Sequence, residues 1–200
     1  MPKLGMEPIR REALVKATIA EIGAHGTLDV TVSQIARRAG MSSALAHHYF
    51  GGKEQILVAA MRYVMGVYAA EVRGALAMAG DSAARVEAIV RASFSERNFR
   101  TDTVAGWMNF YVLAQTSDEA RRLLGVYQRR IRSNLCHCLR PLVGERACDA
   151  AERVAALIDG VYLRQTLGQG QPDRPAAVAH VMGYVALELE HRAAGHGAAS

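Results

Sequence analysis

Two short helical segments, each with its own N-terminal cap and joined by a glycine turn, lie between residues 31 and 50. Thr31 and Gln34 form a T-x-x-Q capping box. Gly40 can adopt the left-handed conformation that ends a helix, and Ser42 is a good N-cap for the next one. Apolar residues recur at helical spacing between the two caps, at Val32, Ile35, Ala36 and Ala39. The pattern predicts a helix-turn-helix.

The second helix of this pair has two distinct faces. Leu45 and Tyr49 are spaced i, i+4, so we expect them to anchor the helix inward. Small residues at Ala36 and Ala39 would let the two helices approach closely. The outward face then carries Ser43, Ala44, His47 and His48.

A helix-turn-helix of this kind places its second helix in the major groove of DNA, where the N-terminal part meets base edges. We expect base contacts from Ser43 and Ala44, and His47 could reach a base or a phosphate. Ser42 and His48 are further candidate DNA-binding residues. Contacts to backbone phosphates are expected from Thr31, Arg37, Arg38, Tyr49 and Lys53. Lys53 also opens a helix, where free N–H groups favour phosphate. The alternative is a plain helical hairpin inside a bundle.

The rest of the chain also reads as helical. Only five prolines are present among 200 residues, and runs of β-branched residues are short. Helical patterns cover about 8–25, 53–78, 82–98, 102–115, 117–141, 146–168 and 174–193. We therefore predict an all-α protein of about nine helices, with a DNA-binding domain at 1–52, a helical domain at 53–195 and a disordered tail at 196–200.

Composition and charge indicate where in the cell the protein is expected to lie and which kind of partner it favours. The formal net charge is +5, and the first 65 residues carry +3 of it, a mild bias toward polyanions. No apolar run reaches the ~20 residues of a membrane span, and the first residues lack the apolar region of a signal peptide. We expect a cytoplasmic protein. The three cysteines cannot all pair with one another, which agrees with a reducing compartment.

Metal, cofactor and catalytic motifs are weak or missing. Cys136, His137 and Cys138 are adjacent, and neighbours on a helix point in different directions, so one ion cannot easily use all three. The sequence has no G-x-S-x-G, no glycine-rich phosphate loop and no H-E-x-x-H. We expect neither a metal nor a cofactor, and a helical enzyme with an unrecognised site is the remaining catalytic alternative.

Residues 11–57 resemble the DNA-binding domain of the TetR family of repressors. The resemblance rests on the run VTVSQIARRAGMSSALAHHYFGGKEQIL, with its capped helices, its Tyr49-Phe50 pair and Lys53. Two positions depart from the pattern, since the family often has glycine where Ala44 stands and a polar residue at Gly51 or Gly52. The resemblance implies a homodimer that represses transcription at a palindromic operator and responds to a small ligand held in a C-terminal helical body.

A narrower resemblance concerns the start MPKLGM, the segments IARRAG and HYF, and the run ALIDGVYLR at 156–164. These are similar to the branch of the family that controls the synthesis of glycine betaine from choline. The implied effector is choline or a related quaternary ammonium compound. The alternative within the family is a regulator of another pathway, such as efflux or catabolism of a different hydrophobic or cationic compound.

A quaternary ammonium has no N–H to donate and is best held by aromatic faces and a nearby carboxylate. Trp107, Phe110 and Tyr111 fall at i, i+3, i+4 of one helix, and Tyr162 follows Asp159 by three residues on another. Asp159 interrupts an apolar run, where an unpaired charge is costly. These five residues are the predicted ligand site, followed by Tyr127 and Asn109. The alternatives are an aromatic stripe in the core and an Asp159 paired with Arg164 or another arginine.

The last two long helices are the predicted dimer interface. Their apolar stripes would form a four-helix bundle across a two-fold axis, from Val154, Leu157, Ile158 and Val161 on one helix and Val178, Val181, Met182, Val185 and Leu189 on the other. The alternative is ordinary packing within one subunit. The helix from Lys53 to Met78 would link the DNA-binding and ligand-binding regions. A DNA-binding protein without a small-molecule ligand remains a further possibility.

Overall fold

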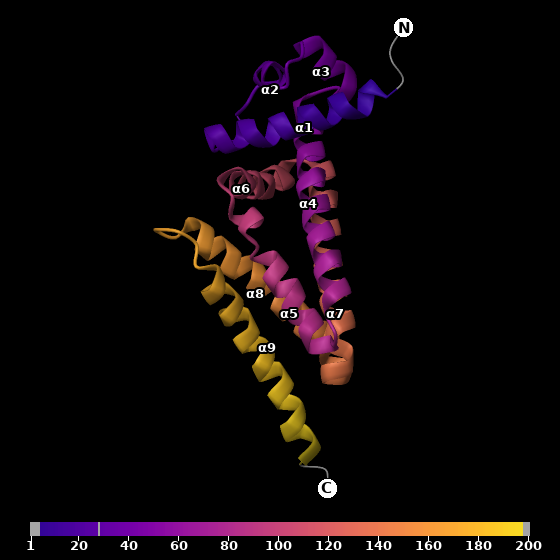
Figure 1. The fold of residues 1–200 in the computed structure, drawn as a ribbon, viewed down its shortest axis with the longest axis vertical. Coiled ribbons are helices and arrows are strands. Elements are labelled where there is room, and N and C mark those ends of the chain that lie inside the picture. The colour runs from indigo at the N-terminus through magenta and orange to yellow at the C-terminus, as the bar shows by residue number, and fades with distance from the viewer. Residues whose placement is uncertain (1–4, 28, 198–200) are drawn as a thin grey trace. The chain divides into compact units, whose positions relative to one another are not determined.

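A computed structural model describes residues 5–27 and 29–197, with side chains as far as residue 190. Throughout these residues the chain forms helices joined by short turns and contains no strand, which confirms the predicted all-α class (Figure 1). It divides into two compact units. Unit 1 is Met1–Val67 with Arg100–Leu124, and unit 2 is Tyr68–Phe99 with Gly125–Ser200.

Unit 1 holds the N-terminal helices together with a later helix. It contains α1 (Met6–His25), α2 (Val32–Arg38), α3 (Ser43–Phe50), the first part of α4 (Lys53–Met78), α6 (Thr101–Thr116) and the start of α7 (Asp118–Val143). Its core is one cluster of buried side chains from the first four helices and the loop before α2: Leu14, Ala17, Ile22, Val30, Ile35, Ala36, Ala46, Tyr49, Ile56 and Leu57. Ala105 and Leu113 of α6 pack against this cluster.

Helix α1 lies across α6, and the two approach closely near the end of α1 (Figure 1). A Cβ atom placed on Gly23 would lie 2.5 Å from Cβ of Asp102 and 2.6 Å from its Cα. Only glycine leaves room for this approach. Two turns into α6, the amide of Asn109 donates a hydrogen bond of 3.2 Å to the carbonyl of Gly26, so α6 contacts the final turn of α1 at two points.

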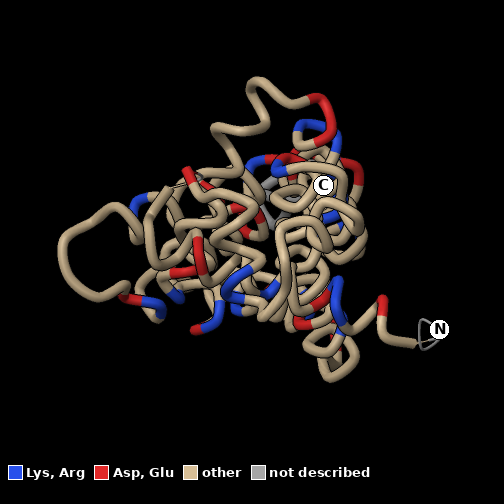
Figure 2. Tube along the Cα trace, turned by 90° about the horizontal axis from the view of Figure 1, so that it is seen from above, with Lys and Arg blue, Asp and Glu red and all other residues tan. Residues whose placement is uncertain are grey.

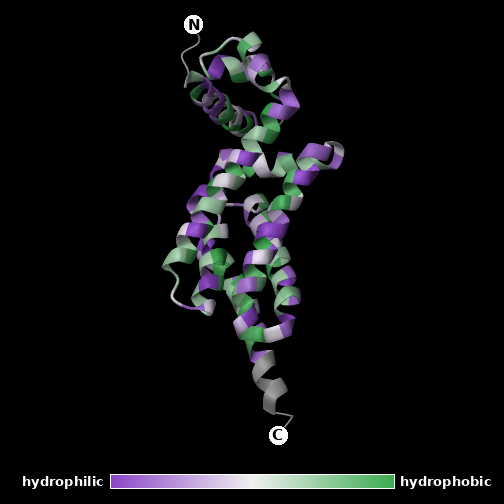
Figure 3. Ribbon diagram, turned by 90° about the vertical axis from the view of Figure 1, so that its right-hand side faces the viewer, coloured by the Kyte–Doolittle hydropathy of each residue, from purple (hydrophilic) through white to green (hydrophobic). Residues whose placement is uncertain are grey.

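Unit 2 holds the remaining helices. These are the second part of α4, α5 (Ser82–Ser93), the 3-10 turn η1 (Glu96–Phe99), most of α7, the 3-10 turn η2 (Gly144–Arg146), α8 (Ala147–Leu167) and α9 (Arg174–Gly197). Polar and apolar residues alternate around these helices, as amphipathic packing requires (Figure 3). The core includes Val72, Ile89, Phe94, Leu135, Leu139, Val154, Ile158, Val181 and Val185.

Two features tie the later helices of unit 2 together. Glu188 of α9 is 7% exposed and forms ion pairs with Arg146, at 3.0 Å, and with Arg153, at 2.9 Å, while Tyr184 donates to the same carboxylate. A disulfide joins Cys136 of α7 to Cys148 in the first turn of α8. Cys138 is the buried free cysteine of the described chain.

Helix boundaries agree closely with the expected ranges, apart from the segment at 82–98. There α5 ends at Ser93 and a separate 3-10 turn covers Glu96–Phe99. The side chain of Asn98 donates to the carbonyls of Ala92 and Ser93, which terminates the helix. Helix α9 extends to Gly197, beyond the expected end, and the remainder of the predicted tail, 198–200, lies outside the described residues. The domain boundary at residue 52 stays a prediction.

Helix α4 is the one described helix that is long and apolar enough to cross a membrane by length and composition. Its buried residues explain that composition without a membrane. Ile56 and Leu57 belong to the core of unit 1, and Val72 belongs to the core of unit 2. A core helix of a helical protein passes the same test.

Candidate DNA-binding surface and ligand site

The expected caps of the helix-turn-helix are present. The backbone N–H of Gln34 donates to Oγ1 of Thr31 at 3.2 Å, and the N–H of Thr31 donates to Oε1 of Gln34 at 2.7 Å. The hydroxyl of Ser42 accepts from the N–H of Leu45 at 3.2 Å. Gly40 has a φ of +67°, the left-handed conformation that the turn requires.

Helix α3 packs on the core of unit 1 through three residues. Ala46 is fully buried and Tyr49 is 9% exposed, and half-buried Leu45 packs against the same cluster. The predicted inward anchor of Leu45 and Tyr49 is therefore confirmed, but the prediction missed Ala46. The reason is that a small side chain at Ala46 allows α3 to pack directly on Ile35 and Ala36 of α2 in one cluster.

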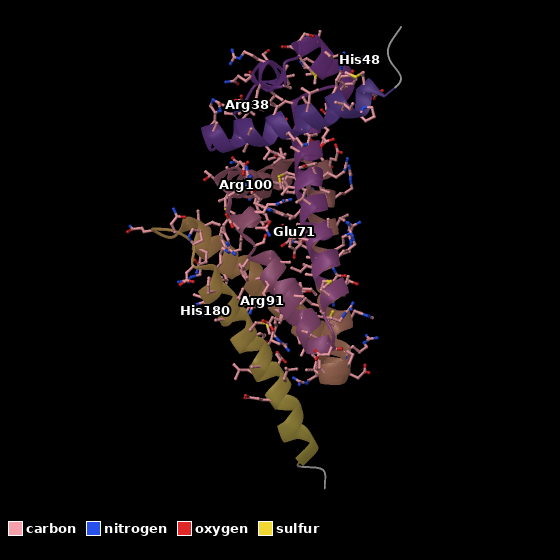
Figure 4. All side chains as sticks on the ribbon, in the orientation of Figure 1. Arg38, His48, Glu71, Arg91, Arg100 and His180 are labelled. Carbon is pink, nitrogen blue, oxygen red and sulfur yellow. A yellow bond between two sulfur atoms is a disulfide. The ribbon has the colours of Figure 1, made fainter. Side chains whose placement is uncertain are left out.

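The outward face of α3 matches the expected one at three positions. Ala44, His47 and His48 are exposed. Ser43 is half-buried, and its hydroxyl donates to that of Ser33 at 3.0 Å. Nδ1 of His47 lies 3.0 Å from the carbonyl of Gly51, which leaves Nε2 for a partner outside the protein. His48 is labelled in Figure 4.

The residues expected to contact phosphates differ in their exposure and in the ion pairs that they form within the protein. Thr31 and Arg37 are exposed, and Lys53 forms only a long pair of 3.9 Å with exposed Asp29. Arg38, also labelled in Figure 4, donates to the buried carboxylate of Glu21. In this structure its guanidinium therefore fastens α2 to α1.

Tyr49 has a structural role that the sequence pattern also indicated. Its ring is buried, and the guanidinium of Arg11 lies 5.8 Å from its centre and 5.0 Å from that of Phe50. The side chain of Arg10 donates to the Tyr49 hydroxyl at 3.5 Å. Arg10 and Arg11 are thus two basic residues beside α3 that we did not single out from the sequence, because their helix carries no motif. Basic and acidic residues are interspersed along the trace (Figure 2).

The three predicted aromatic residues of α6 form one cluster within unit 1. Trp107 is 6% exposed, and its ring centre lies 6.4 Å from that of Phe110 and 5.8 Å from that of Tyr111. Phe110 is almost fully buried. The other two predicted ligand residues, Asp159 and Tyr162, belong to unit 2, and they lie beside a second aromatic group there.

Asp159 of α8 is a largely buried carboxylate in unit 2. Burial raises the pKa of its carboxyl above the usual range, and a hydrogen bond from the Tyr127 hydroxyl, at 3.1 Å, opposes that rise only in part. Within the described part of the chain no lysine or arginine pairs with it, and the expected alternative of a pair with Arg164 is not formed. The negative charge of Asp159 is thus available to a cation.

Two tyrosine rings lie near this carboxylate, and a second aromatic pair includes Tyr162, one turn further along α8. The ring of Tyr68, from α4, lies 5.9 Å from that of Tyr127. Burial raises the pKa of Tyr68 to about 12, and its hydroxyl lies 2.9 Å from that of Ser93. Tyr162 stacks at 5.2 Å on Phe99 and donates to the carbonyl of Asn98 at 2.7 Å.

Tyr68 and Phe99 were missed from the sequence. Tyr68 looked like one more apolar residue of a long helix, and Phe99 lay in a segment that we expected to be continuous helix. The carboxylate Glu71, labelled in Figure 4, lies one turn after Tyr68 and pairs with Arg97 at 3.6 Å.

The apolar stripes of α8 and α9 divide into two sets. Val154, Ile158, Val181 and Val185 are buried inside unit 2, as the intramolecular alternative expected. Leu157, Val161, Val178, Met182 and Leu189 are half-buried. Besides charged residues, the exposed positions of the two helices carry small residues and a few large apolar ones, at Ala156, Gly160, Leu163, Leu167, Gly183, Ala186 and Leu187.

Two protein families match the chain. Residues 14–60 match the bacterial regulatory proteins of the tetR family, and residues 82–190 match the C-terminal domain of BetI-type transcriptional repressors. The HTH-type transcriptional regulator BetI of Brucella melitensis biotype 2 (strain ATCC 23457) is 46% identical over 190 residues, which cover 94% of this chain and 96% of the relative. BetI of Rhizobium meliloti (strain 1021) is 49% identical over 204 residues, covering 98% and 97%.

Solved structures share the fold. A transcriptional regulator from Pseudomonas aeruginosa PAO1 superimposes with a TM-score of 0.81 at 28% identity, covering 93% of both chains. A transcriptional regulator from Saccharomonospora viridis, crystallised in complex with choline, superimposes with a TM-score of 0.77 at 20% identity, covering 88% of this chain and 94% of that one.

Proposed function

This chain belongs to the TetR family of bacterial transcription regulators, with a BetI-type C-terminal domain, and on that premise we propose that it is a choline-responsive repressor of the genes that convert choline to glycine betaine. Its curated relatives are regulators, so the chain is a regulator and not an enzyme. We expect a bacterial regulator that acts on DNA to work in the cytoplasm. The observation that carries the choline assignment is Asp159.

Choline carries a permanent positive charge with methyl groups and no N–H on its nitrogen. A buried carboxylate without a basic partner can neutralise that charge, and the faces of tyrosine rings attract it. Asp159, Tyr127, Tyr68 and Tyr162 supply these groups in unit 2. The choline found in the Saccharomonospora viridis regulator supports the same ligand class. Trp107, Phe110 and Tyr111 remain candidates for further ligand contacts.

DNA recognition is assigned to the exposed face of α3. We propose that Ala44 and His47, with Ser42, Ser43 and His48, face base edges, and that Thr31, Arg37 and Lys53 contact phosphates. Arg38 and Tyr49 support α3 from within, through Glu21 and through the core, and can reach phosphate only at their outer ends.

We propose a homodimer through the exposed faces of α8 and α9. Gly160 and Gly183 have open space where a side chain would stand, so two helices can approach closely there. A two-fold dimer presents two copies of α3, about 34–36 Å apart, to successive major grooves on one face of DNA. The operator is therefore expected to be a palindrome.

The test is a mobility-shift titration with a promoter fragment of choline-oxidation genes from the same organism. The free protein should retard the fragment, and choline should weaken that binding in a saturable manner. Glycine betaine should have little effect, because its own carboxylate would meet that of Asp159. Tight binding that choline leaves unchanged would reject the choline assignment and favour a regulator of another pathway.

A further inference from the structure

Cys136 and Cys148 form a cross-link between the two helices that hold Tyr127 and Asp159. Cys136 lies nine residues after Tyr127 on α7, and Cys148 lies eleven residues before Asp159 on α8. The Cα atoms of the two cysteines are 4.6 Å apart, inside the range that a disulfide spans. The hydrogen bond from Tyr127 to Asp159 joins the same two helices at the other end.

The surroundings of Cys136 and Cys148 favour reversible formation of their disulfide. Both cysteines are half-buried, so a small oxidant or reductant can reach them, whereas Cys138 is buried and stays free. The guanidinium of Arg140, one turn after Cys136, lies 3.9 Å from Sγ of Cys148, and a positive charge there stabilises a thiolate. In a reducing compartment, disulfides are usually transient and often sense the redox state.

We propose that Cys136 and Cys148 are a reversible oxidation site that controls how readily the regulator responds to its ligand. The oxidant class is a hydroperoxide. The Cys148 thiolate attacks the peroxide oxygen and becomes a sulfenic acid, releasing hydroxide. The Cys136 thiolate then attacks the sulfenic sulfur and displaces the oxygen as water. In sum, two thiols and one hydrogen peroxide give one disulfide and two waters, and a dithiol reductant reverses the bond.

The bond is expected to act on the ligand site through α7 and α8. It holds these two helices in the arrangement described here. A ligand that shifts the protein to another arrangement must then overcome the restraint. Oxidation should therefore raise the choline concentration needed for half-maximal release of DNA. The expected effect on the choline response rests on the proposed function, whereas formation of the disulfide does not.

Formation of the bond can be tested on the full-length protein without choline. After treatment with a slight excess of hydrogen peroxide, one of the three thiols should react with an alkylating agent under denaturing conditions, and all three after dithiothreitol. Trypsin cuts after Arg132 and Arg146, so peptides 133–146 and 147–153 should be found linked. The bond closes a loop of 12 residues, and Tm should rise by about 5 °C.

Single substitutions assign the partners. Cys136→Ser and Cys148→Ser should each abolish the linked peptides and the Tm shift, whereas Cys138→Ala should keep both. Three free thiols after peroxide, or a bond that includes Cys138, would overturn the proposal.

The regulatory effect has its own measurement. The half-maximal choline concentration for release of the operator should be at least about 3-fold higher for oxidised than for reduced protein, and equal for both forms of Cys136→Ser. If the disulfide forms but the half-maximal choline concentrations of oxidised and reduced protein agree, the proposal that oxidation controls the ligand response is wrong. The disulfide would then only stabilise the fold. If choline has no effect on either form, the proposed effector fails while the thiol result still stands.

Discussion

In the proposed cation site, Asp159 would set both the affinity for the ligand and its pH dependence. Burial raises the pKa of this carboxyl, so it takes up a proton at a higher pH than a solvated aspartate does. Choline keeps the same charge across acidic and neutral pH, so any titration of its binding in that range belongs to the protein. Affinity for choline should be full at neutral pH and should fall as the pH drops through the raised pKa of Asp159. Calorimetric titration at a series of pH values checks this.

Asp159→Asn is the matched variant, since it keeps the size and a hydrogen-bond acceptor for Tyr127. It should weaken choline binding by about tenfold or more and leave the remaining affinity independent of pH. It should also raise stability at neutral pH, because a buried charge is removed. Unchanged affinity would remove Asp159 from the site.

Substitutions at two residues of the proposed DNA-binding surface should impair DNA binding in different ways. His47 projects from the middle of α3, so His47→Ala should reduce the preference for the operator over random DNA while non-specific binding persists. Lys53 begins α4 and has only a weak ion pair, so Lys53→Ala should weaken binding to every sequence and lower the salt slope by about one. Fluorescence anisotropy with both DNAs at several salt concentrations separates the two effects. Equal loss on both DNAs for His47→Ala would contradict the assignment.

At the level of the elements, the approach of α1 to α6 depends on Gly23. A Cβ atom there would lie within 2.6 Å of the backbone of Asp102, so one helix must move. Gly23→Ala should lower Tm by about 3–6 °C, since overpacking costs about 1–3 kcal/mol and outweighs the gain in helix propensity. Gly66→Ala, in open space on α4, should keep or raise Tm. Thermal unfolding of the two variants gives the comparison, and equal Tm values would mean that α6 adjusts freely.

Glu188 should tie the stability of unit 2 to pH. Burial alone would raise the pKa of Glu188, but hydrogen bonds from Tyr184 and Arg153 and the charges of Arg153 and Arg146 lower it overall. A lowered pKa means that stability is present above the usual value of 4.5 and is lost as the pH falls through the folded-state value.

Glu188→Gln is the matched variant, because it removes the charge of Glu188 and keeps the size of the side chain. It should cost about 1–2 kcal/mol at neutral pH, a modest figure because both arginines are half-exposed, and should remove that part of the acid sensitivity. Urea unfolding at pH 7 and pH 4 measures both, and an identical pH dependence in the variant would contradict the assignment.

The elements themselves were predictable where local chemistry determines them. The caps at Thr31 and Ser42 and both ends of α4 follow from side chains within a few residues. The end of α5 was not predictable, because it depends on Asn98 folding back on the helix end. The ion pairs of Glu188 join residues more than 30 positions apart, and the contact of Tyr68 with Tyr127 joins residues nearly 60 positions apart. No local sequence pattern predicts such contacts. Asp159 was found because a charge in an apolar run is conspicuous by itself.

For the whole molecule, the proposed dimer interface predicts that arginine substitutions at different glycines have different effects. Gly160, Gly183 and Gly74 all have open space in the protomer, so an arginine at any of them should be tolerated within one chain. Gly160→Arg and Gly183→Arg should give monomers by analytical ultracentrifugation and weaken operator binding by about 100-fold or more, because a single head loses half of the contacts. Gly74→Arg on α4 should remain dimeric. Dimeric Gly183→Arg would place the interface elsewhere.

Helix α4 supplies Ile56 and Leu57 to one core and Val72 to the other without a break in the helix. Each residue added between them would advance the downstream part by 1.5 Å and turn it by about 100°, which would bring polar side chains into a core. The number of residues from Leu57 to Val72 is therefore as constrained as the residues themselves. A hybrid regulator that joins this DNA-binding domain to the ligand-binding domain of another protein must therefore keep the number of residues between the two cores. A change of seven residues, about two helical turns, would also keep the same faces of α4 inward.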